Sequence, residues 1–209
     1  MVGNDVVDLD DPETSVEELN PRFDQRVFTA AELRRLSVAG DKRALRWTLW
    51  AAKESAYKLA KRLDPETVFA HSLFETKLNE RGCGTVRHGE WCCAVTVDRK
   101  GSAVHAISTL NRSDREWVVS DLAYVEESDD PSVRVRELAT NSVGQFLEVE
   151  PGAVTITAGD DRIPVLRVDG QPQGHLSLSH HGASVAFAWM PPRDERGGEG
   201  EQGGGGDSG

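Results

Sequence analysis

Three short polar stretches of the sequence combine residue types that could hold a metal ion and move a proton. Asp5 lies near the start of a strand-like run, GNDVVDL, and Glu54 and Lys58 lie four residues apart in WAAKESAYK. The third stretch, HLSLSHHG at 175–182, carries serines and histidines at alternate positions. Carboxylates, an amine and an imidazole together can bind a divalent cation, accept a proton and neutralise phosphate charge.

Each stretch also has an ordinary structural interpretation. Asp5 could cap a turn, and Glu54 with Lys58 could be an exposed helical ion pair, which stabilises a helix by about 0.2–0.5 kcal/mol. His180 could be a structural histidine, because strand alternation places it on the face of Leu176 and Leu178. Zinc binding by the histidines is an open alternative, although their spacing matches no familiar zinc site.

Two local elements must position these groups. A helix is predicted over residues 41–62, with Asp41 as its N-cap. Within it, Trp50, Glu54 and Lys58 form one stripe, and we expect the tryptophan to anchor that stripe in the core. Gly3 should let the backbone of the first strand pass close to another group. Because side chains alternate along a strand, Asp5 and Asp8 should face opposite sides.

The predicted elements occur in the same order twice along the chain. The first half runs from GNDVVDL through the helix to two strand-like stretches, EWCCAVTV and SAVHAISTL. The second runs from REWVVSDLAYV through a helix at 132–148, then AVTITA and IPVLRVDG, to GHLSLSH and ASVAFAW. We therefore predict an α+β fold of two similar subdomains, 1–112 and 113–190, packed as an intramolecular pseudo-dimer. The Gly-rich tail at 191–209 should be disordered.

Composition favours a globular protein, because 38% of the 209 residues are hydrophobic and 28% are charged. The N-terminus lacks the basic start and apolar stretch of a secretory signal, and no apolar run approaches the roughly 18 residues of a membrane span. We therefore expect a cytoplasmic protein. The three cysteines, two of them adjacent, predict neither a disulfide framework nor a zinc site.

Positive charge is concentrated in one segment of this acidic chain. The net charge is -11, but residues 22–62 contain 11 Lys or Arg and four Asp or Glu, a net charge of +7. Such a segment suggests an anionic partner or a phosphate-rich ligand, and a solvated helix face is the alternative.

Taken together and in this order, the motifs resemble the 4'-phosphopantetheinyl transferase superfamily. The stretches that carry the resemblance are VGNDVVDL, FDQRVFTAAEL, WAAKESAYKLA, TVFAHSLFE and LSLSHHG. The length and internal repeat are similar to those of the surfactin-type pseudo-dimers. The motif order is that of the holo-acyl-carrier-protein synthases, so the halves would be in swapped order.

The resemblance implies transfer of the phosphopantetheine arm of coenzyme A, the co-substrate, to a serine of an acyl, polyketide or peptidyl carrier protein. It implies Mg²⁺ held by Asp5 and Glu54, with Glu54 a possible base and Lys58 stabilising the leaving phosphate. It also implies that the coenzyme is bound by Ser179 and His180, by Arg162, by Arg134 or Arg136, and by Lys53 unless that lysine is solvated. We expect a monomer that binds neither nucleic acid nor membrane.

Two departures and two rival functions accompany the resemblance. Val7 stands where many surfactin-type enzymes have a second acid, and His181 stands where the family often has a small or polar residue. One rival is a homologue that binds carrier proteins but has reduced catalytic activity. The other is an unrelated metal-dependent hydrolase that uses His180 and the acids.

Overall fold

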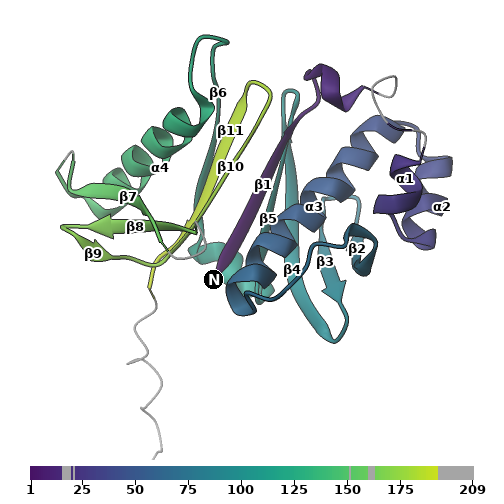
Figure 1. The fold of residues 1–209 in the computed structure, drawn as a ribbon, viewed down its shortest axis with the longest axis horizontal. Coiled ribbons are helices and arrows are strands. Elements are labelled where there is room, and N and C mark those ends of the chain that lie inside the picture. The colour runs from purple at the N-terminus through teal and green to yellow at the C-terminus, as the bar shows by residue number, and fades with distance from the viewer. Residues whose placement is uncertain (16–19, 21, 151, 160–162, 193–209) are drawn as a thin grey trace, which may run out of the picture.

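The computed structural model describes residues 1–15, 20, 22–150, 152–159 and 163–192, and these form an α+β fold, as predicted (Figure 1). The helices are α1 (Phe23–Val27), α2 (Ala30–Val38), α3 (Lys42–Leu63) and α4 (Pro131–Leu147), with the 3-10 turns η1 (Pro12–Thr14), η2 (His71–Leu73) and η3 (Arg112–Trp117). The strands are β1 (Val2–Asp8), β2 (Phe74–Leu78), β3 (Cys83–His88), β4 (Trp91–Lys100), β5 (Ala103–Thr109), β6 (Val119–Tyr124), β7 (Val154–Ala158), β8 (Pro164–Val168), β9 (Gln171–Pro172), β10 (His175–His181) and β11 (Ser184–Met190).

The first half is a five-stranded antiparallel sheet with α3 across one face. The strand order is β1-β5-β4-β3-β2, and β1 pairs with β5 so that Asp5 lies opposite Ala106. The Asp41 side chain accepts from the Ala44 N–H at 2.9 Å, which confirms the predicted N-cap. The face of α3 against the sheet is rich in alanine, with Ala51, Ala52 and Ala56 fully buried, so the helix approaches the strands closely.

Short helices and an aromatic cluster complete the first half beside the start of α3. Thr29 begins α2 with a capping box, because its hydroxyl accepts from Glu32 N–H while the Glu32 carboxylate accepts from Thr29 N–H. Phe23 of α1 stacks on Trp50 at 5.4 Å between ring centroids, and Trp50 stacks on His71 at 4.5 Å. These contacts confirm that Trp50 anchors its stripe of α3.

The second half contains two three-stranded sheets and α4. One sheet has the order β10-β11-β6 and the other β7-β8-β9. The side chains of Leu176, Phe187 and Trp189 lie in one buried cluster with Val135 and Ala139 of α4, so α4 covers one face of the β10-β11-β6 sheet. Asp130 caps α4 by accepting from Ser132 N–H at 2.8 Å.

The opposite face of the β10-β11-β6 sheet meets the first half. In one mixed cluster, Ala186 and Leu122 pack against Val6 and Ala103; a second cluster contains Val2, Ile107, Ala188 and Met190. β1 therefore lies between its partner β5 and the strand β10 (Figure 1). The small side chains on β11 let the two sheets approach.

The observed elements agree with the sequence predictions in order and differ in detail. Helices were expected at 41–62 and 132–148, and α3 and α4 lie within one residue of those bounds. The predicted strand that began at Arg115 starts instead at Val119, because residues 112–117 form η3. The β3 strand was not predicted. The pseudo-dimer and its subdomain bounds stay a prediction.

Two further expectations concern the ends and surfaces of the chain. Of the tail expected to be disordered, residues 193–209 lie outside the described residues. Among the helices that the structure describes, none is long and apolar enough to cross a membrane.

Candidate functional site

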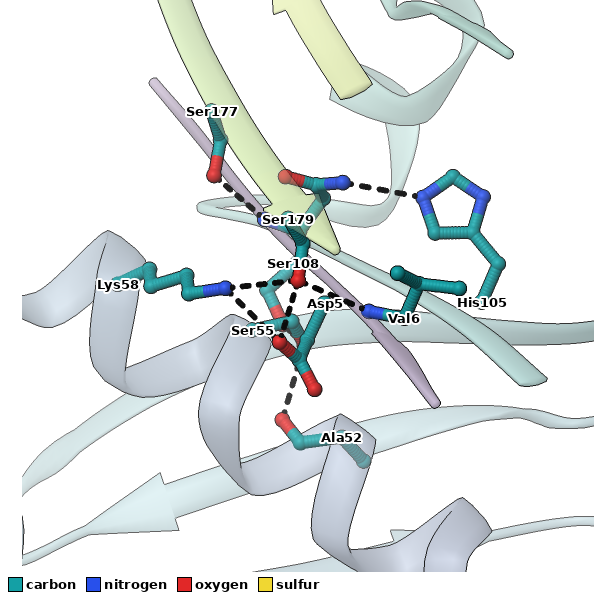
Figure 2. A network of polar contacts seen from close by, with 10 residues as sticks. Asp5, Val6, Ala52, Ser55, Lys58, His105, Ser108, Ser177 and Ser179 are labelled. Carbon is teal, nitrogen blue, oxygen red and sulfur yellow. Dashed lines mark hydrogen bonds and ion pairs between the residues drawn. The ribbon is translucent and has the colours of Figure 1, made fainter. Parts of the chain in front are cut away.

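Asp5 lies at the centre of a polar network where β1, α3 and β10 meet (Figure 2). Its carboxylate Oδ1 accepts a hydrogen bond from the Ser179 hydroxyl at 2.8 Å and pairs with the Lys58 ammonium at 2.8 Å. Lys58 also donates to the Ser179 hydroxyl at 3.2 Å. The structure thus brings together three predicted site residues from three elements that are far apart in the sequence.

The backbone of β1 touches α3 directly beside Asp5. A Cβ atom added to Gly3 would lie 2.1 Å from the Ser55 carbonyl oxygen, so only glycine fits there. Ser55 also donates to the Ala52 carbonyl at 2.9 Å and shares a 2.8 Å hydrogen bond with Ser108 of β5 (Figure 2). The prediction that Gly3 allows a close backbone approach is confirmed.

Glu54 supplies a second carboxylate, one turn of α3 before Lys58. Burial and, to a smaller extent, the negative charge of Asp5 raise its pKa to about 7, against the opposing effect of the positive charge of Lys58. No hydrogen bond or ion pair joins this carboxylate to another residue in the described part of the chain. Glu54 is therefore a proton acceptor near neutral pH with its oxygens free to take a ligand.

These side chains line a pocket of about 300 Å³ between the two halves. Asp5, Val6 and Val7 of β1 form one wall, and Trp50, Glu54 and Lys58 of α3 form another. The third wall comes from β10, through Leu178, Ser179, His180 and His181. Five of the predicted site and metal residues meet in this one pocket: Asp5, Glu54, Lys58, Ser179 and His180.

β10 presents its alternate side chains to β1, as the sequence pattern predicts. Ser177, Ser179 and His181 each accept a hydrogen bond from a backbone N–H of β1. His180 points to the other face of the strand and is exposed at the pocket rim. Asp8 faces away from Asp5, as predicted, and accepts from Asp10 N–H and Ala183 N–H.

A second, smaller pocket of about 190 Å³ continues from the first and shares Lys58 and Leu178 with it. Lys61 and Arg62 of α3 line it together with Tyr57, Ile163, Pro164 and Ser177. Burial lowers the Arg62 pKa to about 10. We did not predict Lys61 or Arg62 as site residues, although their spacing from Lys58, three and four positions, would have placed them on the same side of the helix.

Lys53 lies apart from these pockets. Its ammonium is fully buried, pairs with Glu32 at 2.8 Å and donates to the carbonyl oxygens of His71 and Phe74. The alternative that Lys53 is solvated is therefore wrong, and its binding to coenzyme A stays a prediction. Its ammonium holds α2, α3 and the start of β2 together.

Of the three predicted arginines, the two that the structure describes, Arg134 and Arg136, do not line either pocket. Arg134 is exposed on α4 and pairs with Asp129 and Glu137. Arg136 is also exposed and donates to Ser132 of the same helix. Arg162 lies outside the described residues.

Asp5 and Glu54 are suited to hold a hard cation such as Mg²⁺, because both offer carboxylate oxygens to the same pocket. The Glu54 carboxylate, which has no hydrogen-bond partner among the described residues, supports this fit. Within the described ranges, one group of three potential ligands lies close together, namely Asp11, Glu13 and His181. The zinc alternative that combined His175, His180 and His181 finds no support, since those side chains form no such group.

Comparison with known proteins identifies the family. The model of the 4'-phosphopantetheinyl transferase superfamily matches residues 1–118, more than half of the chain. The chain belongs to this superfamily. The match covers Asp5, Glu54 and Lys58, and membership in the 4'-phosphopantetheinyl transferase superfamily makes the protein a transferase by class. The motif resemblance stated from the sequence is confirmed.

Other comparisons add little to the superfamily assignment. A holo-[acyl-carrier-protein] synthase from Thermotoga maritima is structurally similar over 82% of this chain and 83% of its own, with 12% sequence identity and a TM-score of 0.33. No curated protein matches the chain.

Proposed function

We propose that this protein transfers the 4'-phosphopantetheine arm of coenzyme A to a serine of an apo carrier protein and releases adenosine 3',5'-bisphosphate. The observation that carries the proposal is the convergence of Asp5, Glu54 and Lys58 on one pocket between β1, α3 and β10. Two carboxylates and an ammonium provide what phosphoryl transfer requires: a cation site, a proton acceptor and a positive charge for the leaving group.

Asp5 and Glu54 would hold Mg²⁺. When bound, the ion would neutralise charge on the pyrophosphate and orient it. The carboxylates must be deprotonated for this, and Glu54, whose pKa is about 7, becomes so near neutral pH. Because Val7 stands where many surfactin-type enzymes have a second acid, water would complete the coordination there.

The reaction itself is a substitution at phosphorus. The serine oxygen of the carrier forms a bond to the phosphorus atom next to pantetheine, and the bond from that phosphorus to the adenosine bisphosphate oxygen breaks. Glu54 takes the serine proton, directly or through water. Lys58, one helical turn away, stabilises the negative charge that the leaving phosphate gains.

The nucleotide end of coenzyme A would occupy the rim and the smaller basic pocket. Ser179 lies inside the pocket and His180 at its rim, and Lys61 and Arg62 extend positive charge away from Lys58. Arg162 remains a proposed contact to the nucleotide. Arg134 and Arg136 remain candidates for the 3'-phosphate, although their observed partners lie on or beside α4.

The carrier protein would dock beside α1. A pocket of about 310 Å³ there is lined by Phe23, Arg26, Val27 and His71 and shares Trp50 with the catalytic pocket. Arg22 and Arg26 are exposed and belong to the basic segment. An acidic carrier approaching this side would present its serine to the pocket that contains Glu54.

Incubation with coenzyme A, Mg²⁺ and a panel of apo acyl, polyketide and peptidyl carrier proteins tests the proposal. Intact mass should show the gain of one phosphopantetheine arm on at least one carrier, and Glu54→Gln should abolish most of the gain. Carrier binding without any mass gain would instead indicate a homologue with reduced catalytic activity. Hydrolysis of phosphoesters without a carrier would indicate a metal-dependent hydrolase.

A further inference from the structure

The edge of β1 that does not pair with β5 is covered by side chains of β10. Asn4 N–H donates to the Ser177 hydroxyl at 2.9 Å, and Val6 N–H donates to the Ser179 hydroxyl at 3.2 Å. The third β1 donor, Asp8 N–H, reaches the Nδ1 atom of His181 at 3.3 Å. We name these three hydrogen bonds the side-chain ladder.

The side-chain ladder fixes one register between the two strands. Each of its three pairs is separated by 173 positions, so β10 runs alongside β1 in the same direction, two residues per step. A shift of one residue would bring Leu178 and His180 against β1 and leave its N–H groups without acceptors. Unpaired buried N–H groups are costly, so the ladder resists such a shift.

The middle step of the side-chain ladder is also part of the pocket. Ser179 accepts from Val6 N–H and at the same time donates to the Asp5 carboxylate at 2.8 Å. The position of Ser179 against Asp5 therefore depends on the register of β10. The steps on either side of it, Ser177 and His181, hold that register.

His181 differs from the two serines because its acceptor atom can be protonated. It accepts from Asp8 N–H only while Nδ1 carries no proton. The ligand atoms of Asp11 and Glu13 at η1 and of His181 lie within 4.8 Å of one another, so two carboxylates lie beside the ring.

We propose that His181 is a positioning residue: its Nδ1 atom ends the side-chain ladder and thereby holds Ser179 against Asp5 in the catalytic pocket. The inference rests on the proposed function for its kinetic consequences. It assigns a task to a residue that the family pattern leaves unexplained. His181 acts through the Ser179–Asp5 contact rather than by touching the reacting atoms.

Three variants test the assignment. His181→Asn retains an acceptor near the position of Nδ1, and His181→Leu removes it. His175→Leu is the matched control, because His175 lies on the same face of β10 but forms no hydrogen bond in the described part of the structure. We expect His181→Leu to lower kcat by roughly tenfold, the effect of about 1.4 kcal/mol in the barrier. The carrier KM should stay unchanged, and His181→Asn and His175→Leu should remain within about twofold of wild type.

Rescue by asparagine separates positioning from a general structural role. A His181→Leu rate equal to that of His175→Leu would overturn the inference. Equal defects in the asparagine and leucine variants would overturn it too.

Hydrogen exchange at the Asp8 amide decides the inference independently of activity. Exchange of this amide should be faster in His181→Leu than in wild type and close to wild type in His181→Asn. Should wild type transfer no phosphopantetheine, the proposed function fails, and the exchange measurement still tests the ladder. Unchanged exchange in folded His181→Leu would show that His181 does not hold β1.

Discussion

The Lys58 ammonium lies 2.8 Å from the Asp5 carboxylate oxygen Oδ1, so the two groups form an ion pair. A cation that binds Asp5 must therefore compete with the positive charge of Lys58. The pair is partly exposed, with 30% of the Lys58 side chain and 10% of the Asp5 side chain accessible, and Lys58 can move toward solvent or a phosphate. The ion pair therefore predicts that replacing Asp5 weakens cation binding, whereas replacing Lys58 does not.

Asp5→Ala should weaken binding of Mg²⁺, because Val7 provides no second acid on β1 that could replace the lost carboxylate. We expect the Mg²⁺ concentration for half-maximal transfer to rise at least tenfold, while carrier binding changes little. A Mg²⁺ titration of activity measures the first quantity and carrier binding by calorimetry the second. If the titration curve of the variant overlays that of wild type, Asp5 is not a ligand.

Lys58→Met should abolish most transfer without weakening the metal site. The variant loses the positive charge that stabilises the leaving phosphate, but it also loses the competitor for Asp5. At about pH 8, where Glu54 is ionised, direct binding of Mn²⁺ as a probe should be as tight as in wild type or tighter. Weaker Mn²⁺ binding would show that Lys58 supports the cation rather than competes with it.

Glu54→Gln should leave the fold intact, remove most activity and stabilise the protein above neutral pH. The folded pKa of Glu54, about 7, is above its usual value of 4.5, so the folded state holds this proton more tightly than the unfolded state. The stability that Glu54 contributes is therefore lost as the pH rises from about 4.5 to about 7. Glutamine does not titrate.

The difference in melting temperature between Glu54→Gln and wild type should consequently grow over that pH window and then stay constant. Thermal unfolding at about pH 5 and about pH 8 measures it. A difference that is equal at the two pH values contradicts a raised pKa. A transfer rate within about threefold of wild type, less than roughly 0.7 kcal/mol in the barrier, contradicts the catalytic role.

Lys53→Met should lower the free energy of unfolding by about 3–5 kcal/mol, because it leaves the buried Glu32 carboxylate without its cation. Both side chains are at most 1% exposed. Changing Glu32 to Gln in the same chain should recover much of the loss, since the uncompensated charge disappears. Lys77→Met is the control: it breaks the exposed Lys77–Glu75 pair and should cost under about 1 kcal/mol. Urea unfolding compares the variants, and similar losses for Lys53→Met and the control would contradict the assignment.

Arg22→Glu with Arg26→Glu should raise the KM for the carrier protein and leave the KM for coenzyme A unchanged. Both arginines are exposed, and Arg26 lines the pocket beside Trp50. The wild-type carrier KM should rise with salt, because exposed charges are screened over about 8–10 Å. Arg81→Glu with Arg87→Glu is a control with the same change in net charge on exposed residues of the first half. An equal effect of both pairs on the carrier KM at low salt would argue for net charge rather than docking.

The parts of the site that depend on local spacing could be predicted from the sequence. Trp50, Glu54 and Lys58 follow the helical period, and the alternation in SLSHH placed Ser177, Ser179 and His181 on one face. The pattern could not show what that face meets, because β1 is 173 positions away. The pattern identified the hydrogen-bond acceptors on β10 but not the backbone N–H groups of β1 that donate to them.

Residues whose role depends on a partner in another element were predicted poorly. A lysine on an amphipathic helix is ordinarily solvated, and nothing near Lys53 in the sequence indicates that Glu32 will bury it. Lys61 and Arg62 form a pocket only because β8 and β10 close over them. The β3 strand was missed because CGTVRH is short, contains Gly84 and lacks a clear alternation of apolar residues.

The contact between Gly3 and the Ser55 carbonyl limits which amino-acid substitutions the site can tolerate. No layer of side chains separates β1 from α3 at that point, so the spacing between the strand that carries Asp5 and the helix that carries Glu54 is set by backbone atoms. The two carboxylates therefore keep their separation under substitutions that leave this backbone contact and the buried alanines of α3 unchanged, provided that Gly3 stays glycine.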